Sequence, residues 1–576
     1  MQKFSLLPKW AVSYKRRYLS KDIVAGLTVS VLIVPQGMAY AMIAGLPPVY
    51  GLYAALVPTL TYALFGTSRQ LAVGPVAMDS LLVAAGLGTL ALTGQDNYIA
   101  MAVMLAFMTG ATQLILGVLR MGFLVQYLSK PVISGFTSGA AIIIILSQIK
   151  HILGVDIPQY HQFQKLIISV VSAIPETNGA TLTVGIVGIV MIVVLKRWRP
   201  KVPSILVVVV LGILTVYFFG LWQYGVSIVG EVPKGLPSFT LPDFSWPHAR
   251  DLFTMAVTLA LIGYMEAVSI GKAMEEKSNR ETIEPNRELM ALGASNLLGS
   301  LFQSYSVTGS FSRSAINFGA GARTPLSLIV SVALVALTLL FFTPLFYYLP
   351  SAVLASIIMV SVFGLINIKY PKVLWKYSRD EFILLLFTFA ITLFLGIKEG
   401  ILWGVLFSLL LMVYRTSKPH FAVLGRIKGS DYYKNINRFG ENIEVREDLL
   451  IVRFDGQLYF GNKDYFKKQL FKYLEAKGDK VRAVILNAEA INYIDSTATA
   501  MLVKTIREIH SKNIDFFIAG AIGPARDIIF NSGIIKELHK EYLFVRITEA
   551  VEYYDNPASI SELRMKVAFQ NQNYGI

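Results

Sequence analysis

A series of apolar stretches constrains the fold of this chain most. Fourteen such stretches follow one another before Arg415: Ile23–Ile43, Val49–Phe65, Val76–Leu90, Ile99–Leu119, Val132–Ile149, Leu182–Leu195, Ile205–Phe219, Phe253–Ile270, Leu289–Phe302, Ser310–Gly321, Leu326–Phe342, Ala352–Ile366, Phe382–Leu395 and Gly400–Val413. A simple transmembrane helix needs about 20 apolar residues, and several stretches are shorter, so tilted, buried and broken helices are expected. With 54% hydrophobic and only 15% charged residues, the chain is predicted to be a polytopic α-helical membrane protein.

Basic residues predict the orientation. They fall in the loops after every second crossing: Lys15 to Arg17 with Lys21, Arg69, Arg120, Lys196 to Lys201, Lys272 to Arg280, Arg323, Lys369 to Arg379, and Arg415. Cytoplasmic loops carry such an excess, which explains the net charge of +15 more simply than nucleic-acid binding does. Both termini are therefore expected in the cytoplasm. The chain is expected to span the cytoplasmic (inner) membrane, where it contacts membrane lipid. The residues before Lys21 show no removable signal peptide.

A polar stretch, Ser304–Ser314, lies between two of the apolar stretches and contains Arg313. Non-helical backbone at membrane depth has to be buried in protein or line a wet cavity, and an ionisable residue there is a functional-site hypothesis by default. One short helix is expected to open at Gly309-Ser310 and another at Gly74-Pro75, 235 residues earlier. Two short helices in corresponding positions indicate an inverted repeat with a binding site at the membrane midplane.

Two helix starts that face one another would form an anion site from backbone N–H groups and helix dipoles. Ser310 and Ser312 can add hydroxyl donors, and Gly309 would let an ion approach the backbone. Arg313 is expected to raise the local potential without touching the ligand. Close helix packing is the other explanation for these small residues.

The segment Pro35–Tyr40 is expected to interrupt the first apolar stretch, because Pro35 can kink a helix and free carbonyl groups. Gln36 and Tyr40 are four residues apart, so they share a helix face and could aim an amide and a hydroxyl at the same cavity. A packing kink with polar side chains satisfied by neighbouring helices is the alternative.

Two carboxylates lie within the apolar stretches. Asp79 sits one turn into the short third helix, where its charge suits the helix start but competes with an anionic ligand. Glu266 is the better candidate for a protonatable group whose protonation accompanies anion movement. A permanent partner for Arg313, or a structural hydrogen-bond acceptor, is the alternative role for Glu266.

The sequence changes character near Arg415. Residues 416–446 are predicted to be a linker and 447–556 a small cytoplasmic α/β domain with a mainly parallel sheet, because apolar strands at Leu449–Phe454, Val481–Asn487 and Ile514–Ala519 alternate with helices at Ser496–Ile509 and Ala525–Leu538. Residues 1–21 and 557–576 are assigned to terminal segments and 22–415 to the membrane domain.

Asp495 or Ser496 would cap the helix of the α/β domain that begins there. A regulatory role, in which this helix start binds an anion or nucleotide or Ser496 is phosphorylated, is the functional alternative. No phosphate loop, kinase signature, hydrolase motif or metal cluster is found, so no cofactor, metal or enzymatic activity is predicted. The sequence has no cysteine, which excludes disulfides and thiolate metal sites.

Several motifs resemble the sulphate permease (SulP) family. They are Asp22–Thr28, Val34–Ala41 with Pro35-Gln36-Gly37, Gly45–Tyr53, Thr308–Ser314 with Gly321–Pro325, and a C-terminal segment with Ile494–Thr497 that is similar to a STAS domain. The resemblance covers nearly the whole chain, and the motifs occur in the family's order.

This resemblance implies a seven-plus-seven inverted-repeat fold of about fourteen transmembrane segments, a core that moves against a gate in an elevator-like motion, and a homodimer. By motif match, Gln36, Tyr40, Val76, Ser310, Ser312 and Arg313 would line or influence the anion site, and Glu266 matches a glutamate implicated in proton coupling. Two departures stand out: some prokaryotic relatives carry an acidic residue at the position of Gln36, and the antagonist pattern Asp-Ser-Ser-Gly reads Asp495-Ser496-Thr497-Ala498 here.

These observations predict a secondary transporter that takes up inorganic anions, sulphate first, with protons. Bicarbonate, chloride or dicarboxylate transport or exchange on the same fold is the alternative. A regulatory or sensor protein that responds to anions, and acts through a STAS domain that binds a cytoplasmic protein or nucleotide, is an alternative of another class.

Overall fold

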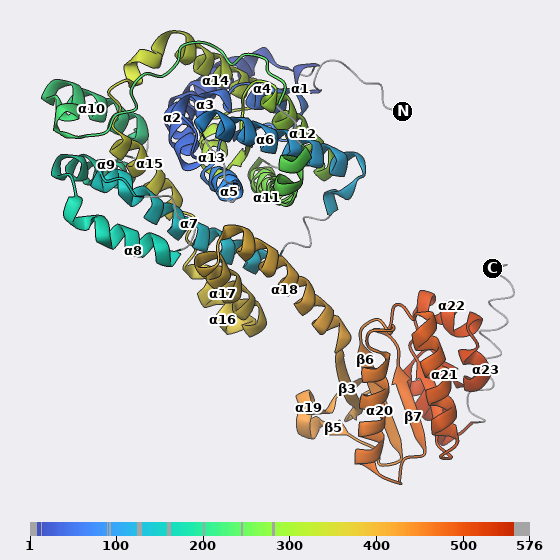
Figure 1. The fold of residues 1–576 in the computed structure, drawn as a ribbon. Coiled ribbons are helices and arrows are strands. Elements are labelled where there is room, and N and C mark those ends of the chain that lie inside the picture. Colours follow the sequence, from blue (N-terminus) through green and yellow to red (C-terminus); the bar gives the residue numbers. More distant parts are fainter. Residues whose placement is uncertain are drawn as a thin grey trace. The chain divides into compact units, whose positions relative to one another are not determined.

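The computed structural model describes residues 9–12, 14–88, 90, 94–123, 129–157, 163–199, 202–242, 246–278 and 283–557 (Figure 1). The chain forms two compact units, Met1–Ser408 and Leu409–Ile576. Residues 1–8 and 13 of the predicted N-terminal segment, and 558–576 of the predicted tail, lie outside the described residues.

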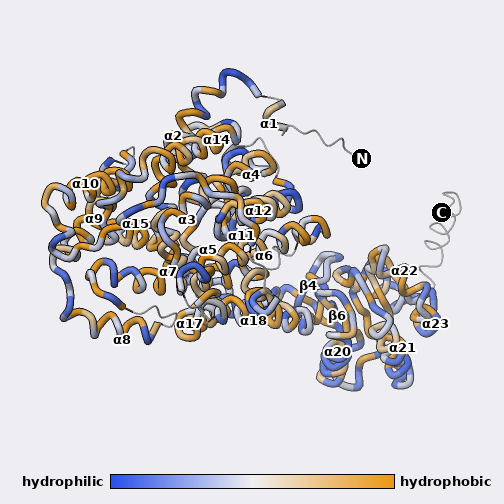
Figure 2. The backbone as a smooth tube through the Cα atoms, turned by 45° about the horizontal axis from the view of Figure 1, so that its top comes forward, coloured by the Kyte–Doolittle hydropathy of each residue, from blue (hydrophilic) through white to orange (hydrophobic). Residues whose placement is uncertain are grey.

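The first unit is helical. Its helices are α1 (Lys9–Val12), α2 (Leu19–Ile43), α3 (Pro48–Tyr53), α4 (Val57–Phe65), α5 (Ala77–Leu87), α6 (Gln95–Val118), α7 (Lys130–Leu153), α8 (Phe163–Ala173), α9 (Gly179–Trp198), α10 (Ser204–Phe219), α11 (Trp246–Ser278), α12 (Pro285–Ser300), α13 (Phe311–Gly319), α14 (Leu326–Leu337), α15 (Ser351–Phe363), α16 (Lys369–Tyr377), α17 (Arg379–Phe394) and α18 (Ile397–Ser417), the last of which continues into the second unit. In the part of the chain that the structure describes, eight helical segments are long and apolar enough to cross a membrane (Figure 2). Helices α5, α10 and α15 are apolar but shorter. The count of fourteen spans therefore stays a prediction.

These helices form two bundles that the chain visits alternately. The first bundle holds α2 to α6 and α11 to α14, and the second holds α7 to α10 and α15 to α17 (Figure 1). The bundles meet where α2 packs against α10 and α15, and where α5 packs against α7. Each of the two chain segments that form the first bundle includes one short helix preceded by a three-residue strand. This helix is α5 in the first segment and α13 in the second.

Glycines bring the helices of the first bundle into backbone contact. A Cβ added at Gly110 of α6 would lie 2.4 Å from the Leu297 nitrogen, and one at Gly293 of α12 would lie 2.6 Å from the Leu114 nitrogen. Real Cβ atoms do not approach backbone so closely, so α6 and α12 can pack in this way only with glycine at both positions. The first bundle is thus a closely packed frame for the segments between its helices.

The second unit contains a sheet with the order β4-β3-β6-β7-β8-β9, and β5 also pairs with β3. Its strands are β3 (His420–Ile427), β4 (Tyr433–Asn435), β5 (Ile443–Glu444), β6 (Leu449–Asp455), β7 (Ala483–Asn487), β8 (Asp515–Ala519) and β9 (Leu543–Phe544). Strands β6 to β9 are parallel, and β3 is antiparallel to β6. The predicted mainly parallel α/β domain is therefore present.

Helices cover both faces of this sheet. The helices of the unit are α19 (Ile436–Phe439), α20 (Lys463–Lys477), α21 (Ser496–His510), α22 (Gly523–Asn531), α23 (Ile534–Leu538) and α24 (Ile547–Asp555). Along β3, Phe421 and Val423 belong to the core with α20 to α23, whereas Ala422 and Leu424 belong to the core under α24. Side chains alternate between faces in a strand, so this pattern buries both sides of β3.

Two segments of this unit differ from the sequence-based expectation. The region 416–446, predicted to be a linker, contains β3, β4 and β5 and is part of the sheet. The predicted helix Ala525–Leu538 is divided into α22 and α23, because Gly533 has a φ of +80°. Such a backbone conformation suits glycine and ends a helix.

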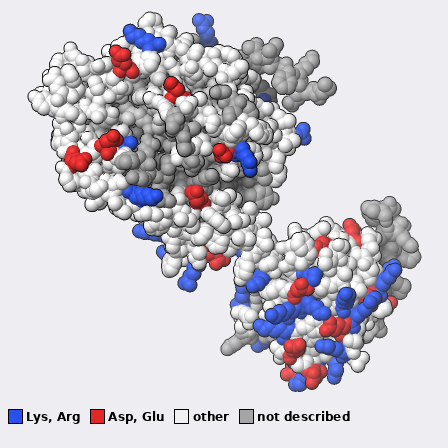
Figure 3. Space-filling view, viewed as in Figure 1, with Lys and Arg blue, Asp and Glu red and all other residues white. Residues whose placement is uncertain are grey.

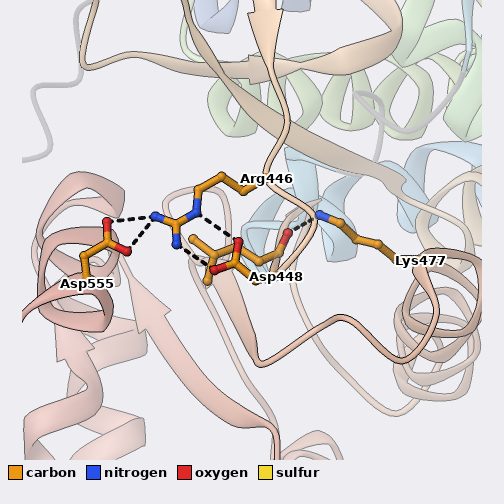
Figure 4. Close-up of polar contacts among 5 residues, drawn as sticks. Arg446, Asp448, Lys477 and Asp555 are labelled. Carbon is orange, nitrogen blue, oxygen red and sulfur yellow. Dashed lines mark hydrogen bonds and ion pairs between the residues drawn. The ribbon is translucent and has the colours of Figure 1, made fainter.

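Arg446 ties α24 to the sheet. Its guanidinium donates to both carboxylate oxygens of Asp448, at 2.6 and 3.0 Å, and to both oxygens of Asp555 at 2.7 Å (Figure 4). Lys477 donates to the Leu449 carbonyl nearby. On the face drawn in Figure 3, charged residues are dense over the second unit and sparse over the first.

Candidate anion-binding site

The two predicted helix starts are joined by a short ribbon. Strand β1 (Ala72–Gly74) pairs antiparallel with β2 (Thr308–Ser310), so that Ala72 lies opposite Ser310 and Gly74 opposite Thr308. Helix α5 starts three residues after Gly74, and α13 starts directly after Ser310. The antiparallel pairing therefore places the starts of the two helices at opposite ends of one ribbon inside the first bundle.

Both helix starts offer backbone donors. Val76 is the N-cap residue of α5 and provides no side-chain cap, so the first N–H groups of that helix remain available. Ser310 caps α13 by accepting from the Arg313 nitrogen at 3.5 Å, and its hydroxyl lies 3.3 Å from that of Ser312. Val76 and Ser310 are each 6% exposed, whereas Ser312 is exposed. Free N–H groups and dipoles of this kind favour an anion.

Arg313 connects the two helix starts. It is fully buried, and its Nη1 donates to the Pro75 carbonyl at 2.8 Å, just before α5. Its Nε and Nη2 have no hydrogen-bond partner among the described residues. Gly74 has a φ of +154°, and a Cβ there would lie 3.3 Å from Nη2. Arg313 thus adds a positive charge at the ribbon while one of its nitrogens holds the β1–α5 turn.

Gly309 contributes packing. A Cβ at this position would lie 2.8 Å from Leu71 Cδ1 and 3.3 Å from the Ala267 Cα. Glycine is therefore needed for β2 to lie directly against α11, next to Glu266. The expected approach of an ion to the Gly309 backbone stays a prediction.

Gln36 and Tyr40 lie in α2, which continues as a helix through Pro35. The expected interruption of this span is absent from the structure. Both side chains are buried, at 4% and 5% exposure, and Gln36 Oε1 has no hydrogen-bond partner among the described residues. A Cβ at Gly37 would lie 3.5 Å from Pro75 Cγ, so this part of α2 packs against the turn that leads into α5.

Asp79 and Glu266 approach the ribbon from α5 and α11. Thr308 Oγ1 donates to the Gly263 carbonyl at 2.6 Å, and a Cβ at Gly263 would lie 3.5 Å from Asp79 Oδ2. Glu266 is three residues beyond Gly263 on the same helix, so the two residues share a face. Asp79 is 1% exposed and Glu266 is partly exposed. Asp79 Oδ1 and Glu266 Oε2 are buried without a partner among the described residues.

Four further polar side chains hold the ribbon in place, and the sequence analysis missed them. Asn296 of α12 donates to the Val307 carbonyl at 3.1 Å and accepts from the Val307 nitrogen at 2.8 Å. On the other strand, Thr59 donates to the Val73 carbonyl, Asn317 donates to the Gln70 carbonyl, and Ser314 accepts from the Ala72 nitrogen. The available signal was a polar residue within an apolar or amphipathic helix.

Two buried carboxylates outside the site have full sets of partners. Glu288 of α12 accepts from the Tyr62 hydroxyl and from the nitrogen and hydroxyl of Thr67. Asp22 of α2 accepts from the Arg323 nitrogen and from both the nitrogen and hydroxyl of Thr324. Both therefore bridge distant segments in a structural role, which distinguishes them from Asp79 and Glu266.

A small cavity of about 50 Å³ lies further along α5. Its lining includes Leu81 and Ala84 of α5 together with Gln148, Lys150 and His151 of α7. These α5 residues are four and seven positions beyond Ala77, which corresponds to about 6 to 10 Å along the helix. The cavity is thus separate from the ribbon but adjoins the same helix, where the two bundles meet.

In the second unit, Asp495 is the N-cap residue of α21. One carboxylate oxygen accepts from the Ala498 nitrogen at 2.7 Å and the other from the Phe460 nitrogen at 2.8 Å. This is the structural role that the sequence analysis preferred for it. Ser496 is exposed at the first position of the helix.

Comparisons with known proteins agree with this architecture. Residues 19–388 match the sulfate permease family, and residues 442–550 match the STAS domain. The chain is 37% identical to the chloroplastic sulfate transporter 4.1 of Arabidopsis thaliana over 98% of this chain and 85% of that protein. It is 32% identical to the high affinity sulfate transporter 2 of Stylosanthes hamata over 95% of this chain and 85% of that protein.

Solved structures are also similar. The murine solute carrier 26 family member A9 anion transporter, in its inward-facing state, superposes with a TM-score of 0.87 at 26% identity, covering 95% of this chain and 94% of that chain. The transmembrane domain of the cyanobacterial bicarbonate transporter BicA superposes with a TM-score of 0.59 at 25% identity, covering 69% of this chain and 98% of that chain. The chain is thus a multi-pass membrane protein that belongs to the sulfate permease family and carries a STAS domain.

Proposed function

We propose that this chain is a secondary transporter that takes up inorganic anions, with sulphate as the leading substrate and protons as the coupling ion. The observation that carries the proposal is the β1–β2 ribbon, which holds the starts of α5 and α13 together with buried Arg313. Sulphate transporters among the relatives support sulphate as the first substrate to test.

The site supplies three kinds of group for an anion. The α5 start offers uncapped backbone N–H groups, Ser310 and Ser312 offer hydroxyls, and Arg313 offers positive charge. Backbone donors at a helix start bind anions without charged ligands, and they do not depend on the shape of one particular oxyanion. In this proposal the backbone and serines are the direct ligands, Arg313 sets the local potential, and Gln36 and Tyr40 border the site from α2.

The coupling and the motion follow from the same arrangement. Glu266 is partly exposed next to β2, so it can exchange a proton with the space where the anion binds. The first bundle would move as the core of an elevator against the second bundle, because the two meet along α2 and α5, the helices that carry half of the site. We place the transporter in the cytoplasmic membrane as a homodimer with both termini inside, and we propose Ser496 as a regulatory position at which the STAS domain meets a partner.

Bicarbonate is the second candidate substrate, because the bicarbonate transporter BicA has a similar transmembrane domain. Bicarbonate carries one negative charge, whereas sulphate carries two. Competition between the two anions for uptake would distinguish the candidates. Binding without transport would favour an anion sensor that acts through the STAS domain.

Sulphate uptake into proteoliposomes tests the proposal. We expect the full-length protein to accumulate labelled sulphate when the outside is more acidic than the inside, and to accumulate less without a pH gradient. Glu266→Gln is expected to weaken the response to the gradient while sulphate still binds. Gln303→Glu, three residues after the end of α12, changes charge outside the site and serves as the control, for which the gradient response is expected to persist. Uptake no faster than in empty liposomes would refute the proposal.

A further inference from the structure

We infer that Asp79 and Glu266 form a two-carboxyl proton site, which takes up two protons with each divalent anion. This inference rests on the proposed function and assigns a role to Asp79, the deeper of the two carboxyl groups. It concerns stoichiometry, so it can fail while anion transport itself stands.

The geometry brings the two groups to the same side of the ribbon. Asp79 Oδ2 lies against Gly263 of α11, one turn before Glu266, and Thr308 of β2 is hydrogen-bonded to the Gly263 carbonyl. Gly309 contacts α11 at Ala267, the residue after Glu266. Helices α5 and α11 and strand β2 therefore meet around one small region that contains both carboxyl groups.

Among the described residues, one oxygen of each carboxyl group lacks the partner that a buried carboxylate oxygen requires. Asp79 Oδ1 and Glu266 Oε2 are buried and lack a hydrogen-bond partner among the described residues. In the same bundle, Glu288 and Asp22 each accept three hydrogen bonds. A buried ionised carboxylate without such bonds is costly, whereas a protonated one is much less so. The contrast separates two structural carboxylates from two that are suited to changing their charge.

The charges that face the pair do not balance two carboxylates. In the part of the chain that the structure describes, the titratable groups around it are Arg313 of α13, Tyr40 of α2 and Tyr305, whose hydroxyl lies 3.1 Å from that of Ser80. Arg313 is the single cation among them, and the tyrosines are neutral. Two ionised carboxylates would leave one net negative charge beside the anion site. Like charges that share a site repel one another, so the doubly ionised pair takes up protons readily.

Binding of an anion favours protonation of the second carboxyl group as well. Asp79 is the third residue of α5, so its carboxylate occupies the positive potential of the same helix start that the anion uses. With a divalent anion present, even two neutral carboxyl groups leave a net charge of minus one beside Arg313. Ionising either group adds a further negative charge. Binding of a divalent anion is therefore linked to protonation of both, whereas a monovalent anion imposes a weaker demand.

The different exposures of the two groups indicate an order of events. Glu266 is partly exposed and Asp79 is 1% exposed. A hydronium ion transfers a proton to a Glu266 carboxylate oxygen, which passes it to an Asp79 carboxylate oxygen. Glu266 then accepts a second proton from another hydronium ion. After the anion leaves on the other side, both protons return to water and the two carboxylates re-form. No redox step or further reactant is needed.

Proton and charge counting in proteoliposomes tests the inference. The full-length protein is reconstituted, and proton uptake per labelled sulphate is measured with a pH dye while the membrane potential is clamped. We expect two protons per sulphate for the unaltered protein, with a rate that is insensitive to potential. For Asp79→Asn we expect one proton per sulphate, with uptake accelerated by an inside-positive potential. Glu288→Gln, which changes a fully bonded carboxylate, should keep the unaltered stoichiometry.

Asp79→Asn with two protons per sulphate would overturn the inference, and so would one proton per sulphate in the unaltered protein. No sulphate flux at all would refute the proposed function instead.

Infrared difference spectra of the full-length protein, with and without sulphate, cover the case in which Asp79→Asn does not transport. We expect sulphate to add the C=O bands of two protonated carboxyl groups, one of which disappears in Glu266→Gln. A gain of a single band, lost in Glu266→Gln, would overturn the role of Asp79.

Discussion

Asn296→Leu should weaken anion binding, although Asn296 does not contact the anion in the proposed site. The amide of Asn296 makes both hydrogen bonds of the Val307 backbone and donates to Gln113 Oε1 at 3.0 Å, and all of these groups are buried. Leucine has a similar shape but cannot replace these bonds. Val307 directly precedes β2, so the substitution leaves the strand that carries Ser310 without its support from α12.

The expected magnitude follows from the groups left unpaired. Each buried polar group that loses its partner costs about 1 to 3 kcal/mol, so the two groups of Val307 together cost about 2 to 6 kcal/mol. If β2 moves to recover these bonds, the cost appears as weaker anion binding. Even about 2 kcal/mol corresponds to a roughly 30-fold increase in the dissociation constant for sulphate.

The assay is the sulphate-dependent rise in melting temperature of the purified full-length protein. Thr109→Val in α6 is the matched control, because Thr109 is fully buried but donates only to the Leu105 carbonyl of its own helix. We expect Asn296→Leu to need far more sulphate for the same rise, and Thr109→Val to behave like the unaltered protein. Equal sulphate affinity in Asn296→Leu would refute the positioning role of Asn296.

Two further predictions concern other parts of the chain. Arg446→Met should speed hydrogen exchange in α24, because the helix loses its ion pairs to the sheet. The lost local stability should be about 1 kcal/mol, since these ion pairs are partly exposed. Arg526→Met on α22 should leave the exchange of α24 unchanged. Hydrogen bonds from Arg446 lower the pKa of Asp448 in the folded protein below its usual 3.8. The stabilisation is therefore fully present above pH 3.8 and is lost as the pH falls through the lowered pKa of the folded state. Equal protection of α24 in both variants at neutral pH would contradict this role of Arg446. Lys150→Gln should raise the KM for sulphate severalfold at low salt with little change in kcat, since Lys150 adds positive charge to the cavity beside α5. Lys165→Gln, on the exposed side of α8, is its control, and an unchanged KM in Lys150→Gln would exclude such a role.

The starts of α5 and α13 were predictable because each combines a glycine with a residue that favours a helix start inside an apolar stretch. Arg313 and Glu266 could be chosen because charge is costly in a membrane. The positions of these residues relative to one another in space could not be predicted from such local signals. The pairing of Ala72 with Ser310 joins residues more than two hundred positions apart, and no local pattern encodes that register.

Other parts were hidden because tertiary packing overrides local preference. Proline at position 35 suggested a broken span, yet α2 continues through it because neighbouring helices enclose this part of the chain. Strand β3 lies in a segment that is polar on average, and its role becomes evident only from its pairing with β6. Asn296 resembles an ordinary polar residue of a helix until its two bonds to Val307 are seen.

A map of the full-length protein with bound sulphate tests the central claim most directly. We expect density for the anion between the starts of α5 and α13, within hydrogen-bonding distance of the backbone N–H groups after Val76 and of the Ser310 or Ser312 hydroxyl. Arg313 should keep its bond to the Pro75 carbonyl. An anion held chiefly by the Arg313 guanidinium, or bound away from the β1–β2 ribbon, would contradict this account.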